Sequence, residues 1–191
     1  MLIYRVFPHV ATAPPGAPGH PLYLHRPQGQ GRLDNPRHYD TWYFATTPEA
    51  AVGETFADLT IWSDDMFEFP KVPGARRALG TFEIADGTPV LDLDDARALY
   101  ERRLRPTQVI ARNRAVTQSW ALDVYDERDD RGGRRWAGIR WWSFQRPHWT
   151  VIALWYPPGE PSAHQVVGVE ELDVTHIAVR DAARSLAKII R

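Results

Sequence analysis

Apolar and aromatic runs alternate along the chain with clusters of proline, glycine and polar residues, and this pattern predicts a series of short strands. The predicted strands are Tyr4–Phe7, Thr41–Ala45, Leu79–Ile84, Pro89–Leu93, Gly138–Phe144, Trp149–Trp155 and Gln165–Val169. The turn signal Asp86-Gly87 predicts that the third and fourth of these strands form a hairpin. Because Trp149–Trp155 is almost entirely apolar, we expect it to lie in the middle of a sheet.

Capping residues and helical spacing predict four helices between these strands. The predicted helices run from Pro48 to about Leu59, from Asp94 or Asp95 to about Leu104, from Asn113 to Tyr125, and onward from about Thr175. The last helix is expected to bury Ile177, Leu186, Ile189 and Ile190. Helices and strands that mix irregularly predict an α+β (mixed α/β) fold, in a single compact domain with a central mixed sheet.

Length, charge and composition narrow the function classes. A chain of 191 residues suits one domain, and 23 Lys+Arg against 24 Asp+Glu is too balanced to favour direct nucleic-acid binding. No stretch is long and apolar enough for a membrane helix, and the start of the chain does not resemble a signal peptide, so we expect a cytoplasmic protein. With no cysteine, any chemistry depends on oxygen, nitrogen and aromatic groups.

Several familiar catalytic patterns are missing from the sequence. It has no glycine-rich dinucleotide turn, no phosphate-binding P-loop, no Gly-x-Ser-x-Gly elbow and no His-Glu-x-x-His helix. The seven histidines are scattered without the spacing of metal ligands on a helix, so no metal site is expected. Five of the eight tryptophans lie between Trp136 and Trp155, and we expect part of this group to pack the sheet and part to border a cleft.

Four polar positions are candidates for a site. Arg32 lies in a glycine-flanked loop and could hold a phosphate, and Tyr43 lies on an aromatic strand and could stack on a ring. Glu54 shares a helix face with small alanines that would let a ligand approach, and Ser143 ends the tryptophan-rich strand. Each residue alone is more typical of a structural or solvated side chain. Their order along the chain is what indicates a site.

That order resembles the RES domain family, whose pattern is an arginine in a glycine-rich loop, a tyrosine strand, a glutamate helix and a later serine segment. The corresponding segments are Gly31-Arg32-Leu33-Asp34, Tyr43-Phe44-Ala45-Thr46, Ala50-Ala51-Val52-Gly53-Glu54 and Ala137-Gly138-Ile139-Arg140-Trp141-Trp142-Ser143. The resemblance spans nearly the whole chain and identifies residues 1–191 as a single RES-like domain. Leu33, Asp34, Ala137 and Trp142 depart from the usual family residues, which predicts altered substrate fit or an inactive member.

The resemblance implies a fold similar to ADP-ribosyltransferase toxins and a toxin of a two-gene system that cleaves NAD at the nicotinamide–ribose bond. Phosphorolysis and hydrolysis both stay open, with NAD as substrate, inorganic phosphate as a co-substrate and no cofactor. In this interpretation Arg32, Glu54 and Ser143 are catalytic: Glu54 stabilises the positive charge that develops on the ribose, and Arg32 and Ser143 bind phosphate. Tyr43 stacks on the nicotinamide or ribose.

The resemblance also implies a protein partner, a small helix-turn-helix antitoxin that covers the active site. Alternatives remain open at this stage: ADP-ribosylation of a protein acceptor, a non-catalytic module that binds a nucleotide or a protein, or a structural subunit with an aromatic interaction surface. The sequence leaves the oligomeric state open, including a homo-oligomer.

Overall fold

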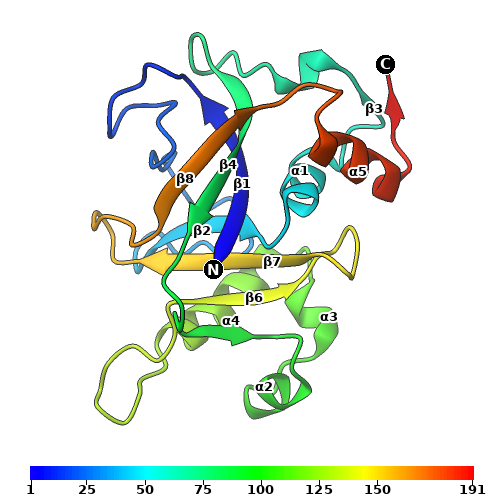
Figure 1. Ribbon diagram of the computed structural model, residues 1–191. Helices are drawn as coiled ribbons and strands as arrows, with labels where there is room; N and C mark the ends of the chain where they lie inside the picture. Colours follow the sequence, from blue (N-terminus) through cyan, green and yellow to red (C-terminus); the bar gives the residue numbers. More distant parts are fainter.

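Seven strands form one mixed sheet, in the order β5-β6-β7-β2-β1-β4-β8, in the computed structural model, which describes residues 1–191 (Figure 1). These strands are β1 (Leu2–His9), β2 (Asp40–Ala45), β4 (Arg76–Glu83), β5 (Val90–Asp92), β6 (Gly138–Trp142), β7 (Thr150–Tyr156) and β8 (Gln165–Glu171). The helices are α1 (Pro48–Phe56), α2 (Ala96–Glu101), α3 (Pro106–Val109), α4 (Arg114–Tyr125) and α5 (Ile177–Leu186), with a 3-10 turn η1 (Asp64–Phe67). None of these helices has the length and apolar character needed to cross a membrane.

The sheet has a weak seam between β1 and β2. Strand β1 pairs with β4 along its full length and β2 pairs with β7 along its full length, but β1 meets β2 at one register position, Tyr4 opposite Ala45. Figure 1 shows the result: β1, β4 and β8 run steeply across the direction of β5, β6 and β7. The two halves of the sheet therefore diverge from each other on either side of this seam.

Each half of the sheet carries its own helices. Helix α4 and the neighbouring α2 pack on β5, β6 and β7 through a cluster that includes Trp120, Val124 and Ile139. Helices α1 and α5 pack together beside β1 and β4 through a second cluster, which includes Ala50, Val179 and Leu79. On the face that carries these helices the seam thus lies between two separate clusters, whereas a third cluster packs β1, β2, β4 and β7 together on the opposite face. Helix α1 stands next to the seam (Figure 1).

Local sequence explains why α1 begins and packs where it does. The Thr47 hydroxyl accepts a hydrogen bond from the backbone N–H of Ala50 at 3.2 Å, and Pro48 occupies the first helical position, as predicted. At Gly53 an added Cβ would lie 2.3 Å from the ring of Trp149. The missing side chain lets α1 pack closely on Trp149, the residue just before β7, and the next residue of the helix, Glu54, lines the cavity described below.

The mixed α/β fold class is confirmed, and each predicted strand is present, with β7 in the interior of the sheet. The predicted hairpin of β4 and β5 is wrong. Strand β4 already pairs on both sides, with β1 and β8, so β5 crosses to the far edge and pairs in parallel with β6. The sequence did not predict η1, α3 or the short parallel pair β3 (Ile61–Trp62) and β9 (Ile189–Ile190).

The expected burial of the last helix is wrong for its three isoleucines, whereas Leu186 is half-buried and packs against the second cluster. Ile177 is 66% exposed, and Ile189 and Ile190 lie in β9 and are also exposed. The buried face of α5 consists of small residues, Ala178, Val179, Ala182 and Ala183. Helix α1 presents alanines to the same cluster, so close packing of the two helices excludes the larger isoleucines.

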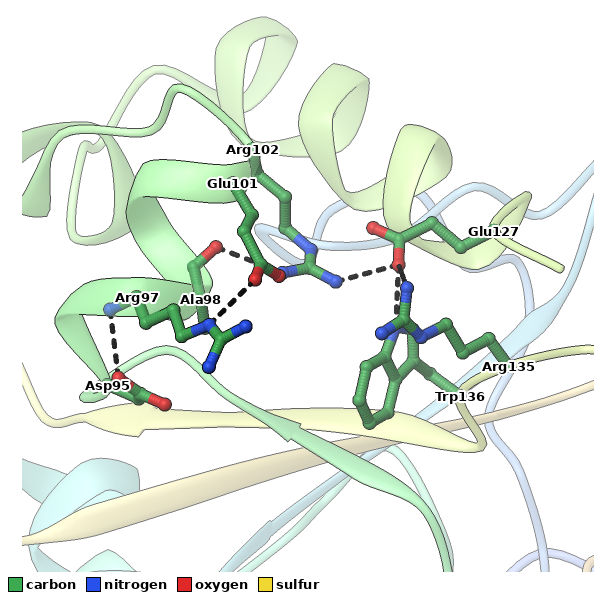
Figure 2. A network of polar contacts seen from close by, with 8 residues as sticks. All are labelled: Asp95, Arg97, Ala98, Glu101, Arg102, Glu127, Arg135 and Trp136. Atoms are coloured by element: carbon green, nitrogen blue, oxygen red, sulfur yellow. Dashed lines mark hydrogen bonds and ion pairs between the residues drawn. The ribbon is translucent and has the colours of Figure 1, made fainter. Parts of the chain in front are cut away.

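A network of charged side chains attaches α2 to the segment that follows α4 (Figure 2). Arg102 donates to a carboxylate oxygen of Glu127 at 2.7 Å and to the carbonyl oxygen of Ala98 at 2.9 Å. The same Glu127 accepts a hydrogen bond from the indole N–H of Trp136 at 2.8 Å, and Arg135 lies 3.8 Å away. Opposite charges are therefore paired within this network, away from the seam.

Candidate functional site

A cavity of about 330 Å³ opens where β1 and β2 separate. Arg32, Tyr43 and Glu54 line it, together with Trp141 and Phe144 from the β6 side. Ser143 does not line the cavity but lies directly behind its wall, hydrogen-bonded to Glu54. The structure therefore brings together all four residues that the sequence singled out, from four separate segments.

Glu54 and Ser143 form the polar pair at the centre of the site. Ser143 is 1% exposed, and its hydroxyl donates a hydrogen bond to the Glu54 carboxylate. Glu54 itself remains open to the cavity, with Ala51 and Thr55 of the same helix beside it. Partial removal of water from around the carboxylate raises the pKa of Glu54, and the hydrogen bond from Ser143 and the positive charge of Arg32 oppose that rise. These two neighbours favour a charged carboxylate inside the cavity.

Ser143 also holds the turn that follows it. Its oxygen accepts hydrogen bonds from the backbone N–H groups of Gln145 at 2.9 Å and Arg146 at 3.2 Å. Its own backbone N–H donates to the carbonyl oxygen of Trp149 at 2.7 Å. The hydroxyl thus links Glu54 on α1 to the loop between β6 and β7.

Arg32 contributes a cation with spare hydrogen-bonding capacity. Its guanidinium donates to the carbonyl oxygen of Val109, while its Nε is buried and has no partner. No carboxylate lies within ion-pair distance, although Glu54 is near enough to oppose the lowering of the Arg32 pKa by burial. An arginine without an acidic partner, next to a cavity, is suited to bind an anion such as a phosphate.

The loop that carries Arg32 is anchored by Asp34. One carboxylate oxygen of this buried residue accepts from the backbone N–H groups of Gly29 at 2.8 Å and Gly31 at 2.7 Å. The other accepts from the hydroxyl of Tyr43 at 2.8 Å. From α4, Gln118 donates to the carbonyl oxygen of Gly31 at 2.9 Å. These bonds fix the backbone on both sides of Arg32.

Two of the four departures from the family pattern, Asp34 and Leu33, therefore have a structural explanation. Asp34 supplies three acceptor contacts that hold the loop, and Leu33 is buried in the core beneath it, away from the cavity. At Ala137 only backbone bonds are made, to Pro89 and Trp155, which align β5, β6 and β7. None of these three side chains lines the cavity.

The role of Tyr43 is broader than the sequence indicated. Its ring lines the cavity. Its hydroxyl donates a hydrogen bond to the Asp34 carboxylate and accepts one from the backbone N–H of Leu33, at 2.9 Å. Burial and the Asp34 charge raise the pKa of Tyr43. Tyr43 thus supports the Arg32 loop with its hydroxyl and offers only its ring to a ligand.

The tryptophan group divides as expected. Trp141 lines the cavity, whereas Trp149 and Trp155 are buried in the core clusters, Trp149 against Gly53 of α1. Sequence reasoning missed Asp34 and Gln118 as loop anchors and Phe144 as part of the cavity wall. The position of Phe144 directly after Ser143 was the available signal. No group of three or more His, Asp or Glu side chains is placed to hold a metal ion.

Comparisons with known proteins identify the family and the fold. The family model described as "RES domain" matches residues 2–176. Among solved structures, the chain is similar to one from the crystal structure of the M. tuberculosis MbcT–MbcA toxin–antitoxin complex, with 14% sequence identity and a TM-score of 0.55. That match covers 95% of this chain and 88% of the other and shows a common fold. Comparison with curated proteins gives no match. The chain belongs to the RES domain family.

Proposed function

We propose that the protein cleaves NAD at the bond between nicotinamide and ribose and acts as the toxin of a toxin–antitoxin system. Family membership and the fold shared with a chain of a toxin–antitoxin complex support the toxin role. The observation that carries the proposed chemistry is the cavity itself, in which a carboxylate, Glu54, and an arginine without an acidic partner, Arg32, face the same space.

Cleavage of the nicotinamide–ribose bond passes through an oxocarbenium-like transition state. The bonding electrons leave with nicotinamide, which departs as a neutral molecule, and positive charge develops on the ribose. A carboxylate placed beside the ribose stabilises that charge more strongly in the transition state than in the substrate, which lowers the barrier. We assign this role to Glu54, which Ser143 orients through its hydrogen bond.

Arg32 is assigned to the phosphate groups. Its guanidinium can bind either the pyrophosphate of NAD or an attacking inorganic phosphate, because both present oxygen pairs that match its donors. When phosphate attacks the ribose carbon, the product is a phosphorylated ADP-ribose; when water attacks, it is ADP-ribose and a proton is released. The buried Ser143 acts through Glu54 in this arrangement, and a direct phosphate contact by Ser143 stays a prediction from the sequence.

The test is to incubate purified protein with NAD and follow free nicotinamide, with and without inorganic phosphate. Release that increases with phosphate indicates a phosphorylase, and release independent of phosphate indicates a glycohydrolase. Transfer of label from NAD to added protein indicates an ADP-ribosyltransferase. Binding of NAD without release of nicotinamide under any of these conditions contradicts the catalytic proposal and supports a non-catalytic module.

The toxin role includes an antitoxin partner, by analogy with the complex named above. We propose a small protein with a helix-turn-helix domain that covers the mouth of the cavity, in the cytoplasm where NAD is available. Adding that partner should suppress nicotinamide release in proportion to the complex formed. Undiminished release from a stoichiometric complex would place the partner elsewhere on the surface.

A further inference from the structure

An exposed aromatic residue stands at the cavity rim, next to the catalytic pair. Phe144 follows Ser143 directly, lines the cavity and is 46% exposed, although an exposed phenylalanine loses the stabilisation that burial would give it. The guanidinium of Arg112, from the segment between α3 and α4, lies 4.7 Å from the centre of its ring. Two segments far apart in the sequence therefore meet at this rim.

The turn that carries Phe144 is held in place. The turn that carries it is held by the two backbone N–H groups that donate to Ser143, at 2.9 and 3.2 Å. Arg112 makes no hydrogen bond or ion pair with the protein, so its contact with Phe144 is its principal interaction. An exposed aromatic ring on a held turn, with an uncommitted cation against it, is an arrangement suited to stack on planar, electron-rich rings.

The size of the cavity indicates which part of a substrate reaches this rim. Its volume of about 330 Å³ lies at the lower end of the range for small-molecule sites, roughly 300–1,000 Å³. That space suits one nucleoside half of NAD, and the half that reacts must lie against Glu54 and Arg32. The adenosine half must then leave the cavity across its rim.

We propose that Phe144 stacks on the adenine of NAD and that Arg112 positions the Phe144 ring for this contact. This inference rests on the proposed function and deepens it, because it makes the site selective for a dinucleotide over nicotinamide mononucleotide, which has the same bond to be cleaved but no adenine. Stacking of a base on an aromatic side chain corresponds to a factor of about 5 to 150 in affinity.

The experiment compares nicotinamide release from NAD and from nicotinamide mononucleotide. In Phe144→Ala, we expect kcat/KM for NAD to fall, mainly through KM, about tenfold further than kcat/KM for the mononucleotide. Phe144→Tyr keeps the ring and should keep the selectivity. Arg112→Gln should lower the selectivity about two- to fivefold, and Arg112→Lys should restore most of it. Equal losses for both substrates, or no loss for either, would overturn the proposal.

A binding measurement separates failure of this inference from failure of the proposed function. If the wild type releases nicotinamide from neither compound, the proposed function fails. The stacking contact of Phe144 is then tested with ADP-ribose, which contains adenine and lacks the bond that is cleaved. Weaker calorimetric binding of ADP-ribose by Phe144→Ala, by about tenfold, supports the stacking contact. Equal affinity of both proteins, or no binding by the wild type, rejects it. Thermal unfolding confirms that each variant is folded.

Discussion

Two regions of the molecule bring arginine and glutamate side chains close together, and they use the charges in opposite ways. In the network of Figure 2, Arg102 and Glu127 contact each other at 2.7 Å, and further opposite charges surround them. At the cavity, Arg32 and Glu54 make no ion pair, and their hydrogen-bond partners are neutral: the carbonyl of Val109 and the hydroxyl of Ser143.

The difference teaches what distinguishes a structural charge cluster from a candidate site. Paired charges neutralise each other and leave little field for a ligand, and in the Figure 2 network the paired charges attach α2 to the segment that follows α4. Charges supported by neutral groups keep their field and their free donors or acceptors. Composition cannot tell the two apart, because both regions use the same residue types.

The largest expected effect is a loss of activity at the cavity, without a loss of stability. Replacing Glu54 with Gln keeps the side-chain shape and a contact with Ser143 but removes the charge, and we expect nicotinamide release to fall about 100- to 1,000-fold. Stability should not decrease, because no ion pair is lost. Rates of nicotinamide release and thermal unfolding curves check both statements. Wild-type release by the variant would remove Glu54 from the mechanism.

An intermediate effect is expected in the network, on stability instead of activity. Glu127→Ala leaves the mostly buried Arg102 and the indole N–H of Trp136 without their acceptor, which should lower the free energy of unfolding by about 1–3 kcal/mol. Nicotinamide release per folded molecule should be unchanged. The double variant Arg102→Met with Glu127→Leu serves as control: because neither charge remains unpaired, it should recover part of the loss in denaturant unfolding. A fall in release rate at full folding would contradict the separation of the two regions.

The smallest effect concerns pH. Because the pKa of Glu54 is raised in the folded protein, the folded state holds this proton to higher pH than the unfolded state. Wild-type stability should therefore decline relative to Glu54→Gln as pH rises from the usual Glu value of 4.5, and the two should follow the same trend below it. The decline should be small, because Glu54 is open to water in the cavity. Denaturant unfolding at several pH values measures it, and a difference independent of pH would refute the raised pKa.

Much of the fold could be predicted from local sequence, and particular residues show where that ends. The cap at Thr47, the cap at Asn113 and the apolar run of β7 each act within a few residues, so each element was located correctly. The hairpin of β4 and β5 was predicted wrongly because strand pairing depends on which sheet edges are free. The isoleucines near the C-terminus failed as core residues because α1 and α5 pack through alanines.

By itself, the sequence determined the mixed α/β class and most of the strands and helices, and it singled out the four residues Arg32, Tyr43, Glu54 and Ser143, whose order resembles the RES domain family. Only the tertiary structure decided how these residues work together. The separation of β1 from β2 creates the cavity, Gly53 lets α1 pack closely on Trp149, and Asp34 turns out to hold the Arg32 loop. The physical reason is that caps and periodicity act over a few residues, whereas ion pairing, burial and cavity shape depend on segments that meet only when the chain is folded.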